Sequence, residues 1–171
     1  MRSKSFVMGL CCTAFFSVPF VVRAATLSKT DMQFMKMAGE ANMTEAHIGQ
    51  MAEKQAADQG IKDFGKKLSA DHTTSYEQLT VLANKTGETI PKAIGHDKTI
   101  DRLASLKGKS FDRAFIQDEV QSHKAAVAAF KNEAEHGEDA DVKAWANSMV
   151  PILEGHLQTV ENLAKMEKPR K

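Results

Sequence analysis

Aromatic residues, proline and glycine are scarce in this chain of 171 residues, which has the length of a single domain. Aromatics make up 6% of the sequence, and there are 4 prolines and 10 glycines. So few strand-forming and turn-forming residues exclude an all-β sandwich or barrel, and the supply of alanine, lysine, glutamate and methionine favours helices. The formal net charge is only +1, so the chain has neither the basic field of a nucleic-acid-binding protein nor an acidic tail.

Motifs of the common catalytic classes are also missing from the sequence. We find no glycine-rich phosphate loop, no Ser-His-Asp arrangement with a supporting loop, and no cysteine nucleophile after the N-terminal segment. Basic residues are not interleaved with aromatic ones, as they are on nucleic-acid-binding surfaces. The sequence identifies no catalytic residue and favours a binding or structural protein over an enzyme.

Residues 1–24 are predicted to form a secretory signal peptide. Two basic residues near the start precede about 17 residues without a charge, and Ala24 and Ala25 offer small residues for cleavage. The alternative is an uncleaved membrane anchor, for which this apolar stretch is at the short limit. We therefore predict export to the periplasm, with residues 25–171 forming the mature domain.

Both cysteines, Cys11 and Cys12, lie in the predicted signal peptide. Its removal leaves 20 basic and 22 acidic residues, a formal net charge of −2. The exported protein would then have no disulfide and no thiolate ligand. Its stability must come from core packing, and any metal site must use histidine, carboxylate or methionine.

Apolar residues recur at steps of three and four along four long segments, each of which is predicted to be a helix. The segments run from about Thr30 to Ala57, Gln59 to Lys85, Ser110 to His136, and Asp139 to Met166. Thr30 and Ser110 are the predicted N-caps of their helices. Short connections make each pair an antiparallel hairpin, and residues 88–109, with a short helix over 97–106, are long enough to cross along the bundle. We see no internal repeat beyond this plan of two hairpins.

One face of each predicted helix carries an apolar stripe. The stripe residues are Phe34, Ala38, Ala41, Ile48 and Ala52; Ile61, Phe64, Leu68, Ser75, Leu79 and Leu82; Ile116, Val120, Val127, Phe130 and Ala134; and Val142, Trp145, Met149, Ile152, Val160 and Leu163. Each stripe is interrupted once by an ionisable residue, and the four interruptions are Glu45, His72, His123 and His156. Counting residues from the hairpin turns places all four near the middle of the bundle, with Glu119 level with His156.

Four ionisable side chains at one level of a core need partners, because burying each one unpaired costs several kcal/mol. Imidazole and carboxylate together suit zinc, copper, iron or nickel. We therefore predict that Glu45, His72, His123 and His156 bind one transition-metal ion (zinc, copper or iron) or a small ligand. Asp71 and Glu119 are predicted as additional ligands or supporting residues. The alternative is that the same side chains form a buried hydrogen-bond network in a non-catalytic cell-envelope or stress-related protein.

A di-iron oxidase is a weaker third interpretation. Bundles of that class take a Glu-x-x-His motif from each of two helices. Here Glu119 precedes His123 by four residues and Glu154 precedes His156 by two, so carboxylates are too few and histidines too many. A contact of Asp71 or Glu119 with a histidine nitrogen would favour the mononuclear site, since ligating histidines commonly have such support.

Methionine is concentrated in the first predicted helix, at Met32, Met35, Met37, Met43 and Met51. One interpretation is ligation of Cu(I) by thioethers. The sequence favours core packing by Met37 and Met51 instead, because no Met-x-Met repeat is sustained.

Several motifs are shared with one exported bacterial family. They are Phe34, Ala41 and Glu45 leading to Ala52, then Ile61-Lys62-Asp63-Phe64, Asp71-His72, Leu106-Lys107-Gly108-Lys109-Ser110-Phe111-Asp112, Val120-Gln121-Ser122-His123, Val150-Pro151 and His156. In these the chain resembles the domain of unknown function 4142, over about residues 29–166. The resemblance implies a ferritin-like four-helix bundle in the periplasm or associated with the outer membrane, and it implies no particular reaction.

Overall fold

The computed structural model describes residues 27–90, 92, 94 and 98–167 of the chain. Regular structure in these residues consists of the helices α1 (Lys29–Gln55), α2 (Gln59–Thr86), α3 (Lys98–Ala104), α4 (Gly108–His136) and α5 (Ala140–Glu167). The predicted signal peptide, with both cysteines and the cleavage residues Ala24 and Ala25, lies outside the described residues. Within the described part of the chain, no helix carries an apolar stretch of the length needed to cross a membrane.

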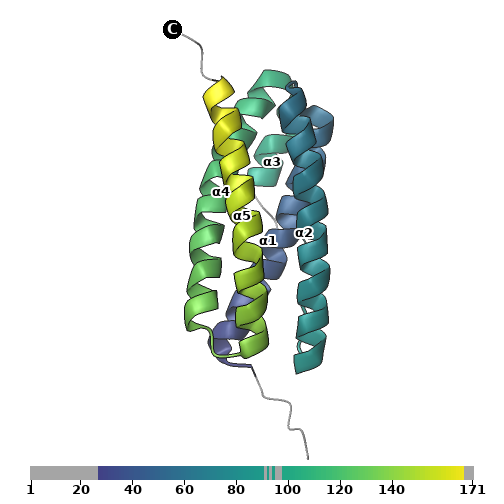
Figure 1. Cartoon of the computed structure of the whole chain (residues 1–171). Coiled ribbons are helices and arrows are strands. Elements are labelled where there is room, and N and C mark those ends of the chain that lie inside the picture. Colours follow the sequence, from purple (N-terminus) through teal and green to yellow (C-terminus); the bar gives the residue numbers. More distant parts are fainter. Residues whose placement is uncertain (1–26, 91, 93, 95–97, 168–171) are drawn as a thin grey trace, which may run out of the picture.

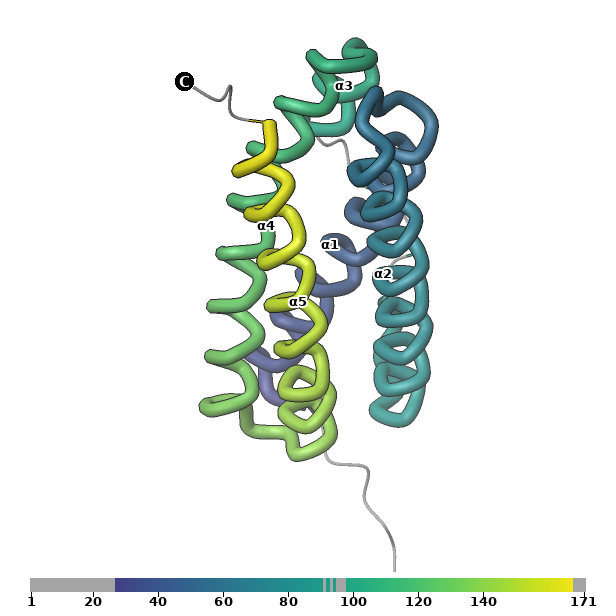
Figure 2. Tube along the Cα trace, turned by 45° about the horizontal axis from the view of Figure 1, so that its top comes forward, coloured from purple at the N-terminus to yellow at the C-terminus, as the bar shows by residue number. Residues whose placement is uncertain are grey.

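The four long helices form a bundle of two hairpins (Figure 1). α1 packs on α2 and α4 packs on α5, while contacts of α2 with α5 and of α1 with α4 join the hairpins. α1 and α5 run in one direction and α2 and α4 in the other, so α4 starts at the opposite end of the bundle from the end of α2. The short helix α3 covers α1 and α4 near the start of α4 (Figure 2). This topology confirms the predicted ferritin-like bundle.

Two predicted N-caps are wrong. Ser28 caps α1, because its hydroxyl accepts a hydrogen bond from the amide of Asp31 at 3.1 Å, so Thr30 already lies within the helix. α4 begins at Gly108, and Ser110 lies in its first turn. α1 therefore begins one residue before Thr30, and α4 begins two residues before Ser110. Periodicity alone does not locate the end of a helix to better than one or two residues.

Each hairpin has one buried aspartate that accepts hydrogen bonds from the loop of the other hairpin. Asp31, at the start of α1, accepts hydrogen bonds from the amides of residues 138 and 139 in the α4–α5 loop, at 3.1 and 2.8 Å. Asp112, at the start of α4, accepts from the amides of residues 57 and 58 in the α1–α2 loop, at 2.9 and 3.2 Å. Each carboxylate therefore satisfies two loop amides with charge-assisted hydrogen bonds.

These aspartates belong to an internal repeat that we did not identify from the sequence. Asp31 and Asp112 each lie 27 residues before a loop aspartate, Asp58 or Asp139, which caps the following helix. Adding 81 to a residue number in the first hairpin gives its equivalent in the second, and buried pairs related in this way include Phe34 and Phe115, Ile61 and Val142, Phe64 and Trp145, Leu79 and Val160, and Leu82 and Leu163. Few equivalent residues are identical, which is why the repeat is hard to see before the caps are known.

The apolar core consists of two clusters, one towards each end of the bundle. The cluster near the α4–α5 loop includes Phe34, Leu79, Phe130 and Trp145. The cluster near the α1–α2 loop includes Met51, which was predicted to be in the core, together with Phe64, Phe111, Phe115 and Leu163. Buried polar side chains at an intermediate level separate the two clusters.

Some predicted core positions are displaced by one residue. Ala41 and Ile152 are exposed, and their neighbours Asn42 and Leu153 are buried in their place. Either of two adjacent residues can continue a stripe with a period of 3.6, so only the facing helices decide which one is buried. Met37, a predicted core residue, is 43% exposed.

Candidate metal centre

Every long helix contributes at least one polar side chain to the layer between the two apolar clusters. The side chains are Asn42 and Glu45 of α1, His72 of α2, Glu119 and His123 of α4, and His156 of α5. Each was placed there by a helical periodicity that otherwise puts apolar residues in the core. The polar layer is therefore part of the bundle core and is formed by residues at core-facing positions of all four long helices.

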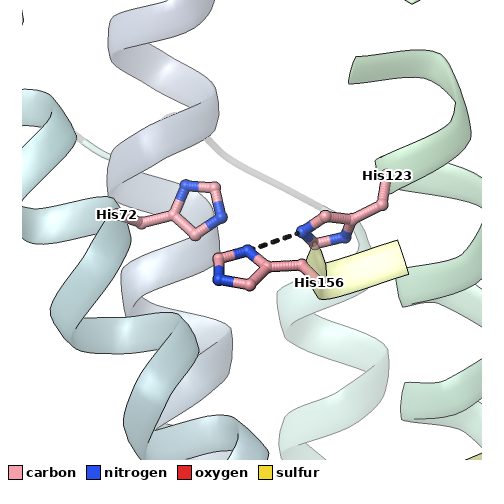
Figure 3. Close-up of side chains that lie close together, drawn as sticks. All are labelled: His72, His123 and His156. Carbon is pink, nitrogen blue, oxygen red and sulfur yellow. Dashed lines mark hydrogen bonds between the residues drawn. The ribbon is translucent and has the colours of Figure 1, made fainter. Parts of the chain in front are cut away.

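Three histidines converge within this layer (Figure 3). His72, His123 and His156 each offer a ring nitrogen, and these atoms all lie within 4.8 Å of one another. Nε2 of His123 is 3.3 Å from Nδ1 of His156, and all three residues are at most 5% exposed. The imidazoles come from α2, α4 and α5, so the site forms only when the two hairpins pack together.

The hydrogen bonds of Asn42 determine the tautomer of His72. The Asn42 amide nitrogen donates to the carbonyl of Ala38 at 2.8 Å, which leaves its oxygen facing Nδ1 of His72, also at 2.8 Å. Nδ1 of His72 must therefore donate, and Nε2 carries the lone pair. That Nε2 atom is buried and has no hydrogen-bond partner among the described residues.

Asp71 determines the tautomer of His156 in the same way. Nε2 of His156 lies 2.7 Å from the Asp71 carboxylate, which also accepts from Lys67. Although burial opposes it, the hydrogen bonds from Lys67 and His156 hold the pKa of Asp71 below its usual value. A carboxylate can only accept, so Nε2 of His156 donates and its Nδ1 lone pair faces His123.

Two oxygens of Glu119 lie beside the outer nitrogen of His123. Nδ1 is 3.1 Å from the Glu119 carbonyl oxygen and 3.2 Å from Oε2. A carbonyl oxygen only accepts, which favours a hydrogen on Nδ1 and a lone pair on Nε2. In that state all three imidazoles have an outer N–H bound to an oxygen and an inner lone pair directed at the others.

The environment keeps two of these imidazoles neutral. Burial, together with the neighbouring His123 and His156, lowers the pKa of His72 to about 3. Burial also lowers the pKa of His156, against the opposing effect of Asp71. Neutral imidazole is the form that binds metal ions.

Glu45 is not part of the three-histidine group. It lies instead with Glu119 and His123, and one ligand atom of each lies within 4.8 Å of the others. Burial raises the pKa of Glu45 well above its usual value, and the Glu119 carboxyl group raises it further. Burial likewise raises the pKa of Glu119 to about 8. The predicted set of four thus separates into two adjacent groups that share His123.

A cavity of about 240 Å³ between α1 and α4 reaches this layer. His72, His123 and Glu45 form part of its wall, and small or apolar residues form most of the rest, including Ala41, Ala125, Ala126, Ala129 and Phe130. A small molecule or ion can therefore approach the histidines from one side of the bundle.

Of the three residues that hydrogen-bond the outer histidine nitrogens, two were predicted from the sequence and one was not. The structure places Asp71 against His156 and Glu119 against His123, two contacts that the sequence suggested. The support of His72 by Asn42 was missed, because the stripe was drawn through Ala41. The signal that could have located Asn42 is the repeat, in which it is the equivalent of His123.

Solved structures with a similar fold come from two groups of proteins. A DUF305 fragment from Deinococcus radiodurans has a TM-score of 0.72 and 13% identity, over 82% of this chain and 99% of the fragment. CopM in the Cu(I)-bound form has a TM-score of 0.71 and 17% identity, over 83% of this chain and all of CopM; the Cu(II)-bound form has a TM-score of 0.66 and 16% identity, over 81% and 97%. At these identities the likeness demonstrates the fold alone.

Family membership rests on the sequence. No curated protein matches the chain. The family model described as domain of unknown function DUF4142 matches residues 18–163, which include all four long helices except the end of α5. The chain therefore belongs to the DUF4142 family.

Proposed function

We propose that this chain is an exported copper-binding protein that holds one copper ion through His72, His123 and His156. The observation that carries the proposal is the hydrogen-bonding of their outer nitrogens to oxygen atoms of Asn42, Glu119 and Asp71. These contacts leave three lone pairs facing one another in the buried polar layer of the bundle. A bound cation removes their mutual repulsion and uses all three as ligands.

Copper is the ion that the ligand set favours. The predicted mature chain has no thiolate, and imidazole suits copper and zinc. Divalent copper binds a given set of nitrogen ligands more tightly than its first-row neighbours. CopM, which has a similar fold, is known in copper-bound forms, and we extend that chemistry to this chain as part of the proposal.

The surrounding side chains would set the properties of the ion. Asn42, Asp71 and Glu119 hold the three rings in position and keep the ligand nitrogens free of hydrogen. When bound, copper supplies one-electron chemistry between its Cu(I) and Cu(II) states. The cavity between α1 and α4 is the proposed route of entry, since it reaches His72 and His123.

Export is the proposed setting of this function. The basic N-terminus, the uncharged stretch that follows it and the alanines at residues 24 and 25 predict a signal peptide. The family resemblance favours the periplasm, with association with the outer membrane as a further part of the proposal. Binding of copper outside the cytoplasm agrees with the predicted signal peptide, and it requires no catalytic residue.

Metal analysis of untagged protein purified from the periplasm tests the proposal. The parent should contain or take up at least one copper ion, and His72→Ala/His123→Ala should lose the ion held by the three histidines. The affinity should fall by more than the roughly 10–100-fold that removal of supporting residues costs. Electron paramagnetic resonance of the Cu(II) form should detect nitrogen ligands in the parent.

His136→Ala is the matched control, because His136 is an exposed histidine at the end of α4. It removes one imidazole from the surface and should leave copper binding unchanged. Equal loss of copper in the control and the double variant would place the ion on the surface and contradict the proposal.

A structural hydrogen-bond network is the second candidate function, and the chain His123–His156–Asp71 favours it. If His123 carries its hydrogen on Nε2, it donates to Nδ1 of His156, and these two imidazoles are satisfied without metal. This candidate expects no copper in the parent and a large loss of thermal stability in His72→Ala/His123→Ala.

A further inference from the structure

A second group of potential ligands adjoins the three histidines. Glu45, Glu119 and His123 each offer one ligand atom, and these atoms lie within 4.8 Å of one another. Oε2 of Glu45 is inaccessible to solvent and has no hydrogen-bond partner among the described residues. Glu119 is 1% exposed, and its Oε2 lies 3.2 Å from Nδ1 of His123.

Two carboxyl groups at this depth are costly when both are ionised, since burial and mutual repulsion both oppose charge. No lysine or arginine side chain is paired with either carboxyl group in the described part of the chain. A divalent cation would neutralise both carboxylates and occupy their unpartnered oxygens. Two carboxylates and one imidazole form a donor set that suits divalent transition metals.

A separate polar pocket of about 210 Å³ reaches the carboxyl pair from the outside. It lies between α1, α3 and α4, and its wall includes Glu45, Glu119, Thr44, Gln121 and Asp118. Asp118 is paired with Arg102 on its outer side. An opening lined by carboxyl, hydroxyl and amide groups is the kind of route that attracts a cation rather than an apolar molecule.

From this geometry we propose a second metal site, formed by Glu45, Glu119 and Nδ1 of His123, which takes a divalent transition-metal cation. The inference rests on the proposed function, because His123 would bind the first ion through Nε2 and the second through Nδ1. The ring of His123 would then bridge the two ions as an imidazolate. Binding of the second ion displaces the hydrogen on Nδ1 and any carboxyl proton to solvent.

Titration of the untagged full protein with Cu(II) tests this site. The parent is expected to bind two ions, and magnetic coupling through the bridging ring should lower the paramagnetic signal below that of two isolated Cu(II) ions. Glu45→Gln should bind one ion, with the undiminished signal of a nitrogen-ligated site. Glutamine matches the protonated carboxyl group in size, and circular dichroism checks that the variant is folded.

Glu40→Gln is the control, since Glu40 is an exposed residue of the same helix, and it should bind two coupled ions. Uptake of a single ion by the parent would overturn the second site and leave the proposed copper function standing. Two ions without magnetic coupling, or two coupled ions in Glu45→Gln, would also overturn it. Uptake of none would overturn both proposals together.

Discussion

The two hairpins of this bundle follow one plan in their caps and cores but differ in the polar layer. In each hairpin an aspartate at the start of the first helix binds the loop of the other hairpin, and apolar residues at equivalent positions fill the core. Equivalent positions in the layer hold different residues, as in the pairs Asn42 and His123, Ser75 and His156, His72 and Leu153, and Glu45 and Ala126. The candidate ligands therefore lie where the repeat is broken.

One of these pairs retains a shared contact. The Asn42 amide donates to the carbonyl of Ala38 at 2.8 Å, and Nδ1 of His123 lies 3.1 Å from the carbonyl of Glu119, in each case four residues earlier in the helix. The same position is thus occupied by a supporting residue, Asn42, in the first hairpin and by a proposed ligand, His123, in the second. The repeated features stabilise the bundle, and the departures from the repeat create its chemistry.

The largest loss of stability is expected from a substitution at a position where the first hairpin is packed more closely than the second. The equivalent of Gly65 is Ala146, but a Cβ atom at Gly65 would lie 2.6 Å from Cβ of Ala52 and 2.7 Å from the carbonyl oxygen of Gly49. Gly65→Ala should lower the free energy of unfolding by up to about 3 kcal/mol, measured by urea denaturation. Ala146→Gly should cost about 1 kcal/mol through helix propensity and about 1 kcal/mol more through loss of its buried methyl group. Equal losses would mean that the two hairpins are packed alike.

Removal of the two aspartates that bind the opposite loop should have the next largest effect on stability. Asp31→Ala and Asp112→Ala each deprive two loop amides of a charged acceptor, so each should lower the free energy of unfolding by about 2 kcal/mol. Asp63→Ala, at an exposed position of α2, is the control and should change stability little. Urea denaturation of the three variants compares them. A loss of stability in only one of Asp31→Ala and Asp112→Ala would contradict the equivalence of the hairpins.

A smaller effect, on affinity rather than stability, is expected at Asn42. Asn42→Ala leaves His72 free to rotate and to change tautomer, so copper affinity should fall about 10–100-fold. Competition titration with a copper chelator measures it. Asn147→Ala, at an exposed position of α5, should leave affinity unchanged. If both variants bind copper as the parent does, Asn42 has no part in orienting His72.

The smallest effect, on the pH dependence of stability, is expected at a carboxyl group that is present in only one of the two hairpins. Glu133 lies beside Asp31, and its equivalent in the first hairpin is Ala52. Burial, together with the neighbouring Asp31, raises the pKa of Glu133 from 4.5 to about 7. The folded chain then holds this proton more strongly than the unfolded chain, so the free energy of unfolding should fall as the pH rises from about 4.5 to 7. Glu133→Gln should remove part of that fall.

Urea denaturation at several pH values between 4.5 and 8 measures this difference. Glu135→Gln, at an exposed neighbouring position, is the control and should keep the pH dependence of the parent. The parent and Glu133→Gln should differ most above pH 7, where the parent carries the buried charge. Identical profiles for the two would show that Glu133 binds protons equally in the folded and unfolded chain.

Much of this architecture could be predicted because helices leave a regular trace in the chain. The periodic stripes located all four long helices, and the short connections identified both hairpins. The same periodicity marked Glu45, His72, His123 and His156 as interruptions of the core. It failed by one residue at Ala41 and Ile152, since the faces of a helix are continuous and the pattern alone does not say which edge is covered.

What the sequence determined by itself was local: which segments are helical, where they turn, and which polar residues lie in the apolar stripes. Those properties depend on residues a few positions apart. Only the tertiary structure decided that three histidines meet, that Glu45 joins Glu119 instead of them, and that Asn42 supports His72. These contacts join different helices, and their geometry depends on the rotation of each helix about its axis. The packing of whole apolar faces sets that rotation, which no single segment of the chain encodes.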